Sequence, residues 1–117
     1  MKAIIEIADT GSALRNARKQ LAESQLGKSP NFCLSFESAK SLFTELTPAR
    51  LDLLDTLSKL GPCNVHALAK SADRSYSNVH ADIVRLEALG LIERSDDNTV
   101  VVPFDAVEIL MPLTKSA

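Results

Sequence analysis

Residues 65–102 contain two short amphipathic segments, a three-residue break between them, and two runs of β-favouring residues after them. The first segment, 65–71, repeats its apolar residues at the i, i+3, i+4 spacing of one helical face, and the second, 76–89, does the same. Helices this short are marginal in isolation, because most of their stability comes from packing an apolar face against a neighbour. The segment therefore predicts two helices that pack on each other and on a further helix.

Residues at the ends of these segments define their limits. Asn64 is placed to cap the first helix, and 73–75 form the turn. Gly90 suits the left-handed position that follows a helix C-terminus. On the second helix we expect Ile83, Leu86 and Leu89 to be buried, together with either Tyr76 or Val79.

Two β-favouring runs follow Gly90, at 91–94 and 99–102. The cluster Ser95-Asp96-Asp97-Asn98 between them is rich in turn-forming residues. This pattern predicts an antiparallel hairpin.

A scaffold helix is predicted just before this segment. Thr47 supplies a capping hydroxyl, Pro48 occupies the first helical position where a missing N–H costs nothing, and Gly61-Pro62 ends the helix. Its apolar face is expected to comprise Leu51, Leu53, Leu54, Leu57 and Leu60.

The N-terminal part of the chain predicts a strand at 2–8, a helix capped by Thr10 or Ser12 that ends before Gly27, and a second strand at 31–36. Ser38 then caps a short helix, 39–45. The apolar run near the C-terminus, 106–111, reads as a third strand or closing helix against 2–8, as a dimer contact, or as a docking edge for a partner.

A length of 117 residues suits one core of ordinary size with appendages. We expect an α+β fold: a winged helix-turn-helix at 47–103, an N-terminal strand–helix extension at 1–46 that is a candidate for dimerisation, and a C-terminal strand or tail at 104–117.

The exposed face of the predicted helix 76–89 has the chemistry of a major-groove reader. It carries hydroxyls, an amide and small residues, which exchange hydrogen bonds with base edges or permit close approach. Basic residues beside it could reach backbone phosphates. The expected DNA-binding residues are Asn64, Lys70, Arg74, Ser75, Ser77, Asn78, His80, Ala81 and Arg85.

The phrase RLEALGLIER, at 85–94, resembles the end of the recognition helix and the first wing strand of winged-helix regulators of the MarR and ArsR kind. A wider set of phrases, from LTPARLDLLDTL at 46 to VVPFD ending at 105, is similar to small prokaryotic winged-helix transcriptional regulators, some of them antitoxins of toxin–antitoxin operons. The resemblance implies sequence-specific DNA binding by a dimer.

Charge argues against strong DNA binding. The segment 47–102 holds six basic and eight acidic residues, so its formal charge of −2 equals that of the whole chain. Asp96 and Asp97 occupy the expected hairpin tip, which is unfavourable for a phosphate contact. Asp82 lies on the predicted reading helix, and we expect Arg85 or Arg74 to pair with it; the alternative is that it accepts a hydrogen bond from a cytosine amino group.

Other functions have weaker support. Cys33 and Cys63 lack paired spacing, and with His66 and His80 they do not make a four-ligand metal site, so no metal, cofactor or disulfide is expected. No catalytic motif is present, and no enzyme activity is expected. The longest apolar runs are too short for a membrane helix, and the N-terminus does not resemble a secretory signal, which favours the cytoplasm.

We therefore expect a homodimeric regulator that binds double-stranded DNA, as a repressor or an autoregulating antitoxin. The alternative is a winged-helix interaction module that binds a partner protein such as a toxin through its terminal strands.

Overall fold

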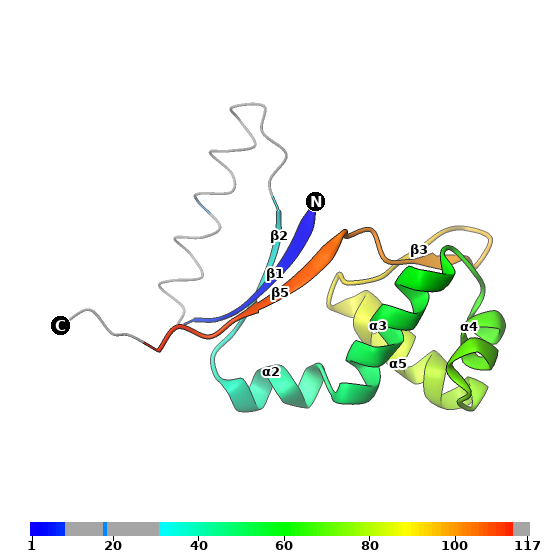
Figure 1. Ribbon diagram of the computed structural model, residues 1–117, viewed down its shortest axis with the longest axis horizontal. Helices are drawn as coiled ribbons and strands as arrows, with labels where there is room; N and C mark the ends of the chain where they lie inside the picture. Colours follow the sequence, from blue (N-terminus) through cyan, green and yellow to red (C-terminus); the bar gives the residue numbers. More distant parts are fainter. Residues whose placement is uncertain (9–17, 19–30, 114–117) are drawn as a thin grey trace. The chain divides into compact units, whose positions relative to one another are not determined.

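The computed structural model describes residues 1–8, 18 and 31–113. These form two compact units of an α+β protein, one of residues 45–103 and one of residues 1–44 with 104–117 (Figure 1). The helix expected between Ser12 and Gly27 lies outside the described residues, Arg18 excepted.

The unit 45–103 contains the helices α3 (Pro48–Leu60), α4 (Val65–Ala72) and α5 (Tyr76–Ala88). A two-stranded antiparallel hairpin follows, made by β3 (Glu93–Arg94) and β4 (Val100–Val101). The predicted order of elements is confirmed. The strands are shorter than predicted: the ladder pairs only Glu93 with Val101 and Arg94 with Val100, while Leu91 and Ile92 lie before it and are buried.

Side-chain caps begin all three helices. Thr47 Oγ1 accepts the Arg50 N–H at 3.2 Å, and Asn64 Oδ1 accepts the Ala67 N–H at 2.8 Å, as predicted. Ser75 Oγ accepts the Asn78 N–H at 3.3 Å, so the last residue of the predicted turn is also a cap.

Left-handed residues end α4 and α5. After α5, Gly90 has φ 83°, and the Leu91 N–H donates to Leu86 O at 3.0 Å while both leucine side chains are buried. Asp73 has the same role after α4 with φ 54°, although it is not glycine.

The core of this unit lies between the three helices and the hairpin. Val79 rather than Tyr76 is buried on α5, because Tyr76 is 43% exposed. The expectation for Leu60 is wrong: it is 46% exposed in the last turn of α3. The buried apolar residues are Leu46, Leu53, Leu54, Leu57, Val65, Leu68, Ala69, Val79, Ile83, Leu86, Leu91, Ile92 and Val100.

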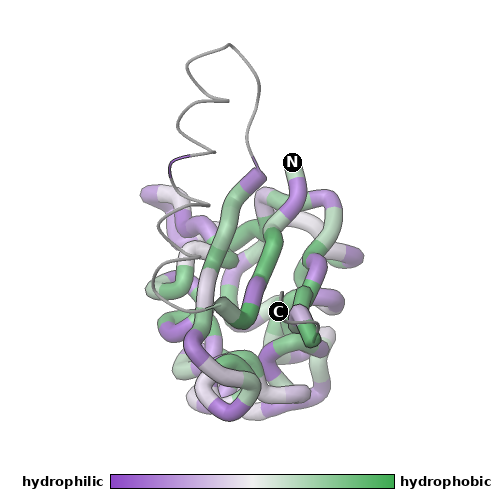
Figure 2. Tube along the Cα trace, turned by 90° about the vertical axis from the view of Figure 1, so that its left-hand side faces the viewer, coloured by the Kyte–Doolittle hydropathy of each residue, from purple (hydrophilic) through white to green (hydrophobic). Residues whose placement is uncertain are grey.

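The other unit is built on a three-stranded sheet. β1 (Lys2–Ile7) lies between β2 (Phe32–Phe36) and β5 (Ala106–Leu110), and both pairings are parallel. β1 begins at the N label of Figure 2 and runs through mostly green, hydrophobic positions. The C-terminal run is therefore a strand against 2–8, one of the forms expected for it.

One face of this sheet is apolar. Ala3 and Ile5 are fully buried, and they pair in register with Val107 and Ile109 of β5. Helix α2 (Ala39–Glu45) contributes the buried Leu42. The Phe32 and Phe104 rings stack with their centroids 5.4 Å apart.

Within the described residues, none of the helices has the length and apolar composition needed to cross a membrane.

Candidate nucleic-acid interface

Helix α5 has a buried side and an exposed side. Val79, Ile83 and Leu86 are fully buried, which fixes the rotation of the helix. Tyr76, Arg85 and Ala88 are among the exposed residues of this helix, and so are five others that we call the exposed face of α5: Ser77, Asn78, His80, Ala81 and Val84. Four of these five were predicted from the sequence, and they come together on one surface as expected.

Val84 is the member of this face that sequence reasoning missed. It is 47% exposed although it is a large apolar residue. Ser77, Ala81 and Val84 follow each other at i, i+4 and i+7, so they form one line along the helix. The sequence contains a signal for it: Val84 directly follows Ile83, and when Ile83 points into the core, the next residue of a helix points about 100° away from it.

Three rings stack beside this face. The His66 and Tyr76 rings lie 4.1 Å apart between their centroids, and the Tyr76 and His80 rings 5.7 Å apart. His66 comes from α4 and the other two from the first turns of α5, so the stack links the two helices. Tyr76 is thereby held in place at the helix surface.

Asn64 and Ser75, two further predicted site residues, act as helix caps. Their side-chain oxygens each accept a backbone N–H of the following helix. This use occupies one acceptor of each side chain and fixes the N-termini of α4 and α5, whose partial positive charge favours phosphate.

Asp82 is held by two arginines. The Arg50 Nε–H donates to Asp82 Oδ1 at 3.0 Å, and an Arg74 Nη2–H donates to Asp82 Oδ2 at 2.8 Å. The Asp82 side chain is only 13% exposed. The prediction that Arg74 pairs with Asp82 is confirmed, whereas Arg50, which lies 32 residues away in sequence, was not foreseen.

Arg85 does not pair with Asp82. Its Nε and Nη2 donate to the two carboxylate oxygens of Glu45, a bidentate pair. The hydrogen bond from Arg85, followed by the charges of Arg85 and Arg50, lowers the pKa of Glu45, and burial opposes this only in part. The same pair raises the pKa of Arg85.

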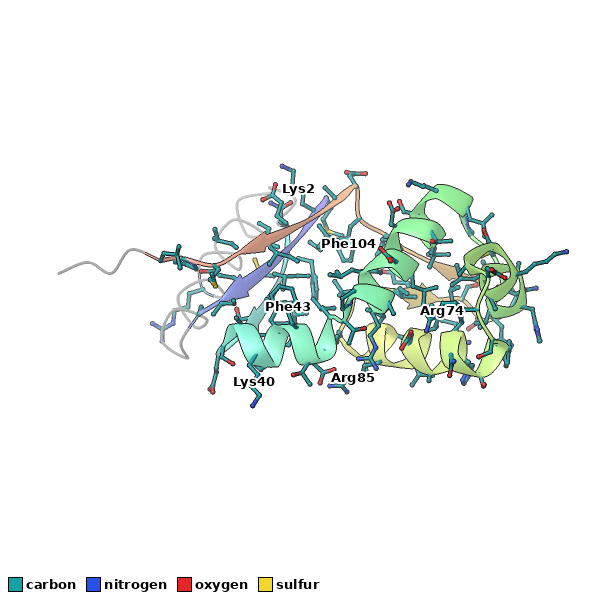
Figure 3. The ribbon with its side chains drawn as sticks, turned by 60° about the horizontal axis from the view of Figure 1, so that its bottom comes forward. Lys2, Lys40, Phe43, Arg74, Arg85 and Phe104 are labelled. Atoms are coloured by element: carbon teal, nitrogen blue, oxygen red, sulfur yellow. The ribbon has the colours of Figure 1, made fainter. Side chains whose placement is uncertain are left out.

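Arg50 connects the two pairs, because its Nη1 also donates to the Glu45 backbone oxygen at 2.8 Å. We call the connected residues the arginine network: Glu45, Arg50, Arg74, Asp82 and Arg85. Arg74 and Arg85 lie at the two ends of α5 in this network (Figure 3). Three guanidinium groups face two carboxylates, so one positive charge remains uncompensated.

Few other positive charges are free in this unit. Lys59 pairs with Asp55 at 2.9 Å, and Arg94 pairs with Glu87 at 3.2 Å. Within residues 45–103, all of them described, Lys70 is the only basic residue without an ion pair. It is exposed on α4, as a phosphate contact requires.

Asp97 stabilises the turn at the hairpin tip through hydrogen bonds to neighbouring residues. Asp97 accepts hydrogen bonds from the Ser95 hydroxyl and, at 3.1 Å, from the Thr99 N–H. These bonds lower the pKa of Asp97. The tip is therefore a closed acidic turn.

Cys33 and Cys63 are not joined in a disulfide, and burial raises the pKa of Cys63. In the part of the chain that the structure describes, no group of three or more His, Cys, Asp or Glu residues is placed to hold a metal ion.

The family model HVO_A0114 matches residues 45–109, more than half of the chain, which includes all of the helical unit and most of β5. No curated protein matches the chain. No solved structure matches it either.

Proposed function

We propose that this chain, which belongs to the HVO_A0114 family, is a sequence-specific DNA-binding transcriptional regulator that acts as a repressor. In this proposal 47–103 are a winged helix-turn-helix, α4 and α5 are its two helices, and β3 and β4 form its wing. The observation that carries the proposal is the exposed face of α5, which holds small polar and apolar residues on a helix whose opposite side is fully buried.

The chemistry of this face suits base edges in the major groove. The Asn78 amide can donate and accept at once, which matches the paired acceptor and donor of adenine. Ala81 and Val84 present methyl groups at the middle of the face, and such groups contact the thymine methyl. The face therefore favours sites that contain A·T pairs.

The paired charges of the helical unit predict a protein with low nonspecific affinity for DNA. The arginine network engages three of the six basic residues of the helical unit, and two more are paired elsewhere. Affinity from phosphate neutralisation is then small. A homodimer that reads two half-sites would double the base contacts, and we include that state in the proposal.

The test begins with selection of bound duplexes from a random double-stranded DNA library by the full chain. The variant Ala81→Glu adds a carboxylate at the centre of the exposed face of α5 and away from the core. We expect it to lower affinity for the selected duplex by at least about 100-fold, since it clashes with base edges and repels phosphate. Fluorescence anisotropy measures the affinity.

Ala49→Glu is the matched control, because Ala49 is exposed in the first turn of α3, where an acidic residue is favourable. Circular dichroism of both variants must equal that of the wild type. Equal DNA affinity for the two variants would show that α5 does not contact the bases. Failure to select any duplex would contradict the proposed DNA binding itself.

A second candidate function rests on β5. Its exposed apolar side chains favour the alternative of a module that binds a partner protein, such as a toxin, through a terminal strand. In that case Ala81→Glu leaves partner binding intact, whereas acidic substitutions in β5 abolish it.

A further inference from the structure

Four large apolar side chains are exposed near the end of the described chain. Ile109 and Leu110 of β5 are 42% and 50% exposed, and Met111 and Leu113, beyond the strand, are 49% and 80% exposed. These four make up almost half of the large apolar residues that are exposed in the described part of the chain. Contiguous exposed apolar residues of this kind mark interaction sites.

Ile109 and Leu110 lie on an edge strand. The sheet order is β2-β1-β5, so one side of β5 bonds to β1 and the other side has no strand beside it among the described residues. Such an edge presents a row of unpaired N–H and C=O groups that can template another strand.

The sequence of the edge is complementary to itself. Glu108 is the only charged residue from 106 to 113, and its carboxylate already accepts a hydrogen bond from Lys2 at 3.0 Å. Antiparallel pairing of two copies about an axis at Glu108 would oppose like charges directly, which is destabilising. An axis at Ile109 or Leu110 instead sets apolar residues against each other and moves each Glu108 opposite Leu110 or Pro112 of the other copy.

We propose that β5 is the dimer interface: it pairs antiparallel with β5 of a second copy, about a two-fold axis at Ile109 or Leu110, and joins two sheets into one of six strands. The isologous contact uses one surface twice, as two-fold dimers do. This deepens the proposed function, on whose dimeric state it rests, and names the surface that forms the dimer.

Cysteine scanning tests the axis. In a chain with Cys33→Ala and Cys63→Ala, single Glu108→Cys, Ile109→Cys and Leu110→Cys variants are oxidised mildly at micromolar concentration without DNA. A cysteine at the axis meets its own copy within disulfide reach, because directly opposed residues are the closest across two strands. We expect most of the Ile109→Cys or the Leu110→Cys chain to become a covalent dimer. Glu108→Cys and the exposed α3 control Ser58→Cys should stay largely monomeric.

Sedimentation equilibrium of chains that keep both native cysteines gives an independent measurement, which holds if the alanine background does not fold. The wild type should have the mass of a dimer, and Ile109→Asp that of a monomer with an unchanged circular dichroism spectrum. A monomeric wild type, a dimer that survives both Ile109→Asp and Leu110→Asp, or dominant crosslinking through Glu108→Cys would overturn the proposal. Because no DNA is present, failure here is distinct from failure to select a duplex.

Discussion

The helical unit and the sheet unit solve the burial of apolar residues in different ways. In the helical unit, residues within one continuous stretch, 45–103, bury thirteen apolar side chains and pair five of six basic residues. In the sheet unit, the third strand arrives from the far end of the sequence and leaves an apolar edge exposed. The helical unit is formed by one continuous stretch of the chain, whereas the sheet unit leaves apolar residues of β5 exposed, which the proposed dimer would cover.

The largest expected effect tests whether the helical core is self-contained. Ile83→Ala removes a fully buried side chain from the centre of α5 and should lower the free energy of unfolding by about 3 kcal/mol, through lost burial and the cavity left behind. Urea denaturation measures the loss. Val84→Ala, one residue along and 47% exposed, should change stability by less than about 0.5 kcal/mol. Similar losses for both would mean that α5 is rotated differently in the folded protein.

The next effect concerns the arginine network. Asp82→Asn removes the carboxylate that accepts from Arg50 and Arg74, and leaves both guanidinium groups partly buried without their partner. We expect a loss of about 2 kcal/mol in unfolding free energy, because hydrogen bonds between charged groups at such a site exceed those of exposed pairs. Asp52→Asn is the control, since Asp52 is exposed and makes no ion pair in the described structure. Equal unfolding free energies of the two variants would show that the arginine network does not stabilise the helical unit.

Glu45→Gln tests whether the network also limits DNA binding. It releases one guanidinium, Arg85, beside the exposed face of α5. The logarithm of DNA affinity should then fall more steeply with the logarithm of salt concentration, by about 0.9 for each subunit. Lys70→Ala should make the slope shallower by a similar amount. Unchanged slopes in both variants would exclude phosphate contacts by these two residues.

The pH dependence of stability provides a second test of the Glu45→Gln variant. The folded pKa of Glu45 lies below its usual value of 4.5, so its pairing contributes stability above that value and loses it as the pH falls through the folded pKa. Glu45→Gln has no such carboxylate. The difference in urea midpoint between the two proteins should therefore be largest at neutral pH and shrink in acid, and a difference that grows in acid would reverse the assigned sign.

The contrast between the units also explains what the sequence could predict. Helix limits followed from local signals, since Thr47-Pro48, Asn64 and Gly90 act on their immediate neighbours. The pairing of Arg85 with Glu45 and of Arg50 with Asp82 joins residues 40 and 32 positions apart, and no spacing rule reaches that far. For α5, the exposed face was predictable from the apolar period, whereas the partners of its charged residues were not.

The sheet shows the same limit. Strands at 2–8 and 31–36 were visible as Ile-rich and Phe-rich runs, but their order and parallel direction depend on a crossover and on the distant β5. Whether Tyr76 is buried or exposed was ambiguous for a different reason. It and Val79 both fit the apolar period, and only the stack with His66 and His80 decides for the surface.

The smallest expected effect lies at the turn between α4 and α5. Asp73 holds φ 54°, a left-handed conformation that costs energy in a residue with a Cβ, and it places a negative charge at the C-terminus of α4. Asp73→Gly should therefore raise the unfolding free energy, by about 0.5 kcal/mol after the greater freedom of glycine in the unfolded chain is deducted. Asp52→Gly, the same exchange inside α3, should lower it by about 0.3 kcal/mol, since glycine has only a slightly lower helix propensity than aspartate. A loss at both positions would mean that the Asp73 side chain stabilises this turn by more than its backbone conformation costs.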